Sequence, residues 1–273
     1  MGACVQEKES VSEWSHCIIN KILGGKIMNE KLYTIPVQDA FTTDCECPVC
    51  VMKQTLERAS IEYTLGPSYM EDDIRMVTDK HGFCNRHIKE LYGEQNRLGL
   101  ALMLKTHMDN VIKETEKLAG KGSAATPSSL FKKKEESKIP VVTYLNKLEN
   151  SCFICSRVEN VFDRYIATIF YLYEKEKDFR TLFANSKGFC NNHYALLYEN
   201  AGSYLKGDKK EEFIISLNKV YLENMKRVRD ELDWFIDKFD YVNADKPWNN
   251  SQDALPRTII KTNSTNVEPK LQK

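Results

Sequence analysis

The chain has 273 residues, with 39 Lys and Arg balanced by 39 Asp and Glu, and a hydrophobic share of 42%. That length is enough for one large or two modest domains. The balanced charge argues against a general binder of the nucleic-acid backbone, no run of about 18 apolar residues is present to cross a membrane, and Gly and Pro are too scarce for a disordered chain. We therefore expect a soluble globular protein.

The first segment, residues 1–27, lacks the basic start, apolar run and small-residue cleavage site of a signal peptide, so we expect a cytoplasmic protein. The residues Gly24-Gly25-Lys26-Ile27-Met28 can be encoded by a bacterial ribosome-binding sequence followed by a start codon. We predict that translation begins at Met28, and a disordered leader over 1–27 is the alternative. Without this segment, seven of the nine cysteines remain.

Two copies of a cysteine and histidine pattern organise the rest of the chain. In each copy a Cys-x-x-Cys motif is followed by Gly-Phe-Cys-Asn-x-His, with 33 residues between Cys50 and Cys84 and 34 between Cys155 and Cys190. The motif cysteines and histidines are Cys47, Cys50, Cys84 and His87 in the first copy, and Cys152, Cys155, Cys190 and His193 in the second. Self-similarity at this separation predicts an internal duplication.

The duplication divides the chain into segments. Residues 28–119 and 140–241 are predicted to be two helical repeats, each organised around one set of motifs. Residues 120–139, which are rich in small and polar residues before a run of charges, are typical of a flexible linker. Residues 242–273 contain several Asn and Pro that interrupt any periodic pattern, so we expect an extended tail.

The periodicity inside each repeat is helical. Apolar residues recur at steps of three and four over 98–112, 158–173 and 214–228, as in amphipathic helices. Strand-type alternation is scarce, and Leu32–Val37 is the best candidate for a strand. The fold class is therefore predicted to be all-α. The aromatic residues within 158–173 could line a ligand pocket, but packing in a core is the expected role.

The two motif sets have the chemistry of metal sites. A Cys-x-x-Cys turn can aim two thiolates at one point, and Cys-x-x-His places both side chains on one face of a helical turn. Gly82 and Gly188 permit the positive φ that such a turn needs. Three Cys and one His make a closed tetrahedral set, typical of structural Zn²⁺. We expect two zinc ions per chain. The spacing favours ligands from one half of the chain for each site, and exchange between the halves is the alternative.

The motif cysteines have several alternative roles besides zinc binding. An iron–sulfur cluster is one alternative, and dithiol redox chemistry is another, although the βαβ context of thioredoxin-like motifs is missing. Haem attachment fails because Val51 and Ser156 stand where a histidine is required. Disulfides are disfavoured without a secretory signal. Cys45 lies outside the pattern, as a partly buried thiol or a spare ligand.

No constellation of catalytic residues is found. His81 has Lys187 as its counterpart and His107 has Tyr221, which argues against a ligand role for either histidine. The run Glu71–Asp73 is explained by a helix N-terminus, where acidic residues favour the helix dipole. The sequence contains neither a glycine-rich phosphate loop nor a metalloprotease motif. We therefore do not expect an enzyme.

The motifs and the late segments Trp234-Phe235, Lys246-Pro247-Trp248 and Ala254-Leu255-Pro256-Arg257 together resemble a family of uncharacterised bacterial proteins. That family is classed as a domain of unknown function and comes mostly from Gram-positive anaerobes. The resemblance covers roughly Met28 to Lys261 and implies no activity. The label of transporter solute-binding protein, which some members carry, implies export, and no signal or lipoprotein motif supports it here.

These observations predict a cytoplasmic, zinc-stabilised helical protein that acts as an interaction module without catalytic activity. A redox- or metal-responsive thiol switch and an iron–sulfur protein are the alternatives. A protein partner and self-association are both left open, and neither is identified. Nucleic acid is not expected, because the basic run Lys132–Lys134 is followed directly by glutamates. A membrane is not expected, because no apolar run is long enough to cross one.

Overall fold

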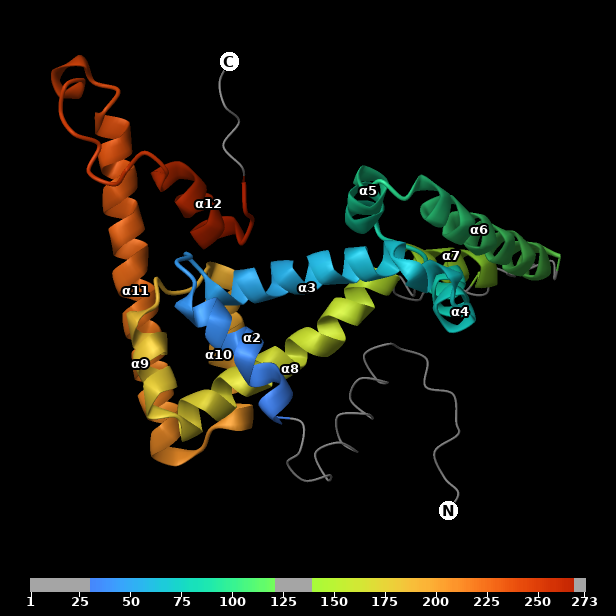
Figure 1. The fold of residues 1–273 in the computed structure, drawn as a ribbon, viewed down its shortest axis with the longest axis horizontal. Coiled ribbons are helices and arrows are strands. Elements are labelled where there is room, and N and C mark those ends of the chain that lie inside the picture. The colour runs from blue at the N-terminus through green and yellow to red at the C-terminus, as the bar shows by residue number, and fades with distance from the viewer. Residues whose placement is uncertain (1–29, 121–138, 268–273) are drawn as a thin grey trace, which may run out of the picture. The chain divides into compact units, whose positions relative to one another are not determined.

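The computed structural model describes residues 30–120 and 139–267 (Figure 1). All regular elements in these two ranges are helices, which confirms the all-α prediction. The helices are α2 (Glu30–Thr42), α3 (Pro48–Leu65), η1 (Pro67–Met70), α4 (Asp72–His81), α5 (Asn85–Gly93), α6 (Arg97–Ala119), α7 (Pro140–Glu149), α8 (Phe153–Lys175), α9 (Lys177–Asn185), α10 (Asn191–Tyr204), α11 (Gly207–Asp237), η2 (Tyr241–Asn243) and α12 (Ala254–Asn263). The predicted leader 1–27 and nearly all of the predicted linker 120–139 lie outside the described residues.

The chain divides into two compact units. Of the described residues, unit 1 contains 30–53 and 162–267, and unit 2 contains 54–120 and 139–161. The division falls inside the long helices α3 and α8, so each unit takes residues from both halves of the sequence. The compact units therefore differ from a linear division into 28–119 and 140–241. Among the described residues, no helix is long and apolar enough to cross a membrane.

Leu32–Val37, the best candidate for a strand, belongs to helix α2. Val37, Ala40 and Phe41 lie three and four residues apart, and all three are buried. Their burial follows the helical period rather than the period of two of a strand. Pro36 lies inside the helix, where the burial of this face outweighs the backbone hydrogen bond that a proline loses.

The prediction of an extended tail over 242–273 is also wrong for the described residues, which end at 267. They include the ten-residue helix α12, which packs against α11. Pro256 suggested a break, but it is the third residue of α12. The first turn of a helix has no intrahelical partners for its N–H groups, so a proline there costs no hydrogen bond.

Aromatic side chains form much of the core of unit 1. The rings of Phe183 and Phe213 lie 5.3 Å apart, and Phe41 from α2 contacts the ring of Phe179 at 4.9 Å. Phe170 and Tyr173 of α8 are buried in this core. Core packing is thus the role of the α8 aromatic stripe, as expected.

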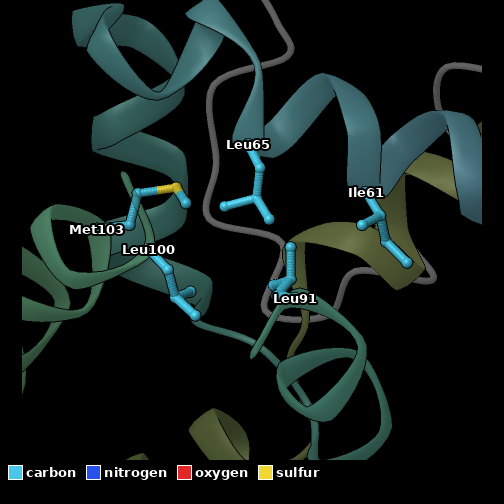
Figure 2. Packing of buried hydrophobic residues seen from close by; sticks show 5 residues of the cluster. All are labelled: Ile61, Leu65, Leu91, Leu100 and Met103. Atoms are coloured by element: carbon cyan, nitrogen blue, oxygen red, sulfur yellow. The ribbon is translucent and has the colours of Figure 1, made fainter. Parts of the chain in front are cut away.

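One core cluster of unit 2 is aliphatic. Figure 2 shows five of its buried side chains, from α3, α5 and α6: Ile61, Leu65, Leu91, Leu100 and Met103. The apolar stripe predicted over 98–112 is mostly exposed, since Leu98, Met108 and Ile112 are all at least half accessible. The start of α6 is apolar on several sides, so periodicity alone did not select the buried face.

Candidate metal centres

All eight predicted ligand residues come together in two clusters, one in each unit. The unit 1 cluster contains Cys47, Cys50, Cys190 and His193, and the unit 2 cluster contains Cys84, His87, Cys152 and Cys155. Within each cluster, all four candidate donor atoms lie within 4.8 Å of one another. Either cluster could hold a metal ion.

The clusters exchange ligand pairs between the halves of the sequence. Each Cys-x-x-Cys pair meets the Cys-x-x-His pair of the other copy, so the expectation of ligands from one half is wrong. The helix α3, which begins at the first pair, has 18 residues and therefore extends about 27 Å. The chain that leaves Cys50 thus enters unit 2 before it reaches Cys84.

Local structure presents the donors in the same way in both clusters. Each Cys-x-x-Cys pair lies at the start of a long helix, α3 or α8. Cys84 and Cys190 are the N-cap residues of α5 and α10, which places each histidine in the first turn of its helix. Gly82 and Gly188 have φ of 59° and 82°, as predicted from the sequence.

The distances between donors fit a tetrahedral metal ion. A zinc ion with Zn–S of about 2.3 Å and Zn–N of about 2.0–2.1 Å requires S···S of about 3.8 Å and S···N of about 3.6 Å at tetrahedral angles. In the unit 1 cluster, Cys190 Sγ lies 3.8 Å from Cys47 Sγ and 3.6 Å from Cys50 Sγ. His193 Nδ1 lies 3.1–3.5 Å from the same three sulfurs.

The unit 2 cluster has matching dimensions. Cys84 Sγ and Cys155 Sγ are 3.9 Å apart. His87 Nδ1 lies 3.3 Å from the sulfur of Cys152 and 3.4 Å from those of Cys84 and Cys155. In both clusters the histidine therefore turns the same ring nitrogen toward the sulfurs.

Protonation of the thiols in the unit 1 cluster is uneven. Burial, together with a hydrogen bond to Cys190, raises the pKa of Cys47 to about 12. Hydrogen bonds from Cys47 and Cys50 lower the pKa of Cys190 well below its usual range. Without a metal, the cluster thus concentrates negative charge on Cys190 and keeps Cys47 protonated. A metal ion that binds all three sulfurs must displace protons.

Helix α12 supports the unit 1 cluster from outside the motifs. The ammonium of Lys261, only 1% exposed, donates to the backbone carbonyl of Glu46 at 2.7 Å and to that of Lys187, and it forms an ion pair with the Glu46 carboxylate at 3.1 Å. It thereby joins the residue before Cys47 to the residue before Gly188. Just after α12, the hydroxyl of Ser264 donates to Cys190 Sγ at 3.0 Å.

In unit 2, residues within the motifs or directly before them make the corresponding connection. The N–H of Phe153 donates to the carbonyl of Gly82 at 3.0 Å, and the Ser151 hydroxyl donates to the carbonyl of His81 at 2.7 Å. Pro48 occupies the position of Phe153 in the other copy and has no N–H to donate. Lys261 bridges the two segments there instead. Sequence reasoning missed Lys261 and Ser264, because their distance along the chain gives no signal.

A charged pair lies beside the unit 2 cluster. Arg86 Nη2 is 3.0 Å from His87 Nε2, and the same guanidinium forms a bidentate ion pair with Glu57 at 2.6 and 3.0 Å. The positive charge of Arg86 offsets the negative charge that the thiolates would bring.

The remaining sequence candidates lie outside the clusters. Cys45 is partly exposed, with its sulfur 3.9 Å from the carbonyl of Ala40, and the seven described cysteines are all free of disulfides. His107 Nδ1 lies 2.7 Å from the carbonyl of Asp79, which is a packing role. Asp72 and Asp73 occupy the first turn of α4, where they favour the helix dipole.

Comparisons with known proteins give a family but no activity. Neither the curated proteins nor the solved structures contain a match to this chain. A family of unknown function, DUF6062, matches residues 28–269, which include both clusters and α12. The chain belongs to this family.

Proposed function

We propose that each cluster binds one structural Zn²⁺ and that the zinc-loaded chain is a cytoplasmic, non-catalytic interaction protein. The observation that carries the proposal is the pair of four-donor sets with tetrahedral dimensions. Four protein ligands complete the usual coordination of zinc and leave no open position for water or substrate. A site of this kind stabilises a fold rather than activating a reactant.

The donor distances favour a single ion over an iron–sulfur cluster. An iron–sulfur cluster distributes its thiolates over several irons that are bridged by sulfide. The sulfurs here are 3.6–3.9 Å apart, the separation of ligands that share one ion. Thiolate and imidazole together are also a typical zinc donor set.

The charges around the clusters also support bound zinc. Three thiolates and one Zn²⁺ leave a net charge of −1 at each site. Lys261 lies beside the unit 1 cluster and Arg86 beside the unit 2 cluster, so each site has one cation close by.

Zinc at these positions would hold together distant parts of the chain. Cys47 and Cys190, in the same cluster, are 143 residues apart in the sequence. Structural zinc contributes roughly 10–16 kcal/mol of apparent binding free energy, as much as the whole stability of about 5–15 kcal/mol of a typical domain. Both units are therefore expected to depend on their metal.

The interaction role is supported by apolar side chains on the surface. On α6, Leu98 and Met108 are 67% and 62% exposed, and Phe239 and Tyr241 after α11 are 75% and 89% exposed. Where such exposed apolar side chains form a contiguous patch, they mark a protein-binding surface.

Metal analysis of the purified full-length chain tests the proposal. We expect two zinc ions per chain, no brown colour, and loss of helical circular dichroism when a strong chelator removes the metal. Iron at a similar stoichiometry, or a chain that keeps its full helicity without metal, would overturn the structural zinc role.

A further inference from the structure

The two clusters differ in their exposure to solvent. All four residues of the unit 1 cluster are buried, and Cys190 is 0% exposed. In the unit 2 cluster, Cys152 and His87 are buried, but Cys84 and Cys155 are partly exposed. A molecule in solution can therefore reach sulfur in the second cluster much more easily than in the first.

The sulfurs also differ in what surrounds them. In unit 1, the Ser264 hydroxyl donates to Cys190 Sγ, and Lys261 is buried close by. A donor on a thiolate withdraws electron density from the sulfur and lowers its nucleophilicity. The residues of the unit 1 cluster are thus buried, and the Cys190 sulfur is also less nucleophilic.

In unit 2, by contrast, Cys84 lines a cavity of about 240 Å³. Its other walls include His81, His107 and Leu148. A water molecule occupies about 30 Å³ in the liquid, so the cavity has room for a small polar molecule.

The cavity wall contains a hydrogen-bond acceptor. His107 Nδ1 faces the carbonyl of Asp79, which can only accept, so Nδ1 carries the proton. In the neutral imidazole, His107 Nε2 is then an acceptor. This nitrogen lies next to Gly82, because a Cβ built on that glycine would lie 2.6 Å from it. A hydroperoxide has an O–H group that such a nitrogen can bind.

We propose that Cys84, in the zinc-loaded unit 2 cluster, is the site at which small hydroperoxides oxidise this protein and release one of its two zinc ions. The proposal rests on the zinc-binding function above and adds a chemical response that is confined to one site. The class of reactant is a small, uncharged hydroperoxide that fits the cavity beside Cys84.

The reaction is a two-electron oxidation in two steps. The Cys84 thiolate attacks one peroxide oxygen, the O–O bond breaks, and the leaving oxygen departs as water or an alcohol after taking a proton. The Cys155 thiolate, 3.9 Å away, then attacks Cys84 Sγ. An S–S bond forms, the S–O bond breaks, and hydroxide leaves as water after protonation. Two thiolates are oxidised to one disulfide, and one peroxide is reduced.

The disulfide removes two of the four zinc ligands in unit 2. Cys152 and His87 alone cannot complete a tetrahedral site, so the ion is released. The unit 1 cluster keeps its ion, because its sulfurs are buried and α12 with Ser264 lies over it.

The experiment uses the full chain, zinc-loaded, in a background where Cys4, Cys17 and Cys45 are replaced by Ser. Hydrogen peroxide is added, released zinc is followed with a chromogenic chelator, and disulfides are mapped by mass spectrometry without reduction. We expect release of one zinc of the two, with a disulfide that includes Cys84, reversed by a thiol reductant and added zinc. Oxidation of Cys190 before Cys84, equal release of both ions, or no release would overturn the proposal.

A matched pair of variants tests the cavity itself. Leu148→Trp fills the cavity and should slow the release of zinc while both ions still bind. Leu222→Trp, at an exposed position on α11, should leave the release rate unchanged. Equal rates in both variants would refute access through the cavity. A protein purified without zinc would instead contradict the proposed function, so the two failures are distinguishable.

Discussion

Replacing Lys261 with Met keeps most of the side-chain volume but removes the buried ammonium of α12. The change takes the donor from two backbone carbonyls, those of Glu46 and Lys187, and a cationic partner from the Glu46 carboxylate. An unsatisfied buried polar group costs roughly 1–3 kcal/mol, and removal of one partner of a buried ion pair about 3–5 kcal/mol. Arg227 still pairs with Glu46 at 2.7 Å, so we expect a loss of about 3 kcal/mol.

Urea unfolding of the zinc-loaded protein, followed by circular dichroism, measures this loss. Lys187→Met is the matched control. The Lys187 side chain is 44% exposed and pairs with Asp44, whose side chain is 79% exposed, so replacing Lys187 should change the stability very little. A Lys261→Met variant as stable as the Lys187→Met variant would refute the inference that α12 supports the unit 1 cluster.

Three further predictions concern the ligands, the glycine turns and pH. Cys50 and Cys190 share one cluster, so the double variant Cys50→Ser/Cys190→Ser should lose one zinc, whereas Cys50→Ser/Cys84→Ser should lose both. Metal analysis counts the ions that remain. The reverse result would show that each site takes its ligands from one half of the sequence. Gly188→Ala should lower the free energy of unfolding by about 1–3 kcal/mol, because φ is 82° and an added Cβ would lie 3.1 Å from the Val220 carbonyl. Gly93→Ala is the control, since the space around Gly93 is open. Equal unfolding midpoints for the two variants would contradict this prediction. Zinc affinity should fall as pH falls, because Cys47, with its pKa raised to about 12, must lose a proton to bind the metal. In chelator competition, each displaced proton changes the affinity roughly tenfold per pH unit. An affinity that does not change with pH would show that no proton is displaced.

Helical periodicity predicted the fold class because an amphipathic helix needs a repeated apolar face regardless of its partners. The prediction was correct for α8, whose stripe is buried, and incorrect for α6, where Leu98 is exposed and Leu100 is buried. When several sides of a helix are apolar, the neighbours decide which side is covered. Pro256 was misleading for a related reason: it lies in the first turn of α12, where a proline costs no hydrogen bond.

The eight residues of the two clusters and the local geometry that aims them could be predicted from the sequence. Spacing within one turn decides which two side chains point together, and a glycine with positive φ is a local requirement. Which pairs meet could not be predicted, because it depends on the fold. That choice depends on where α3 and α8 take the chain before it returns, and each half offers the same donors. The role of α12 was hidden in the same way, because Lys261 becomes a bridge only when folding brings it to Glu46, 215 residues away in the sequence.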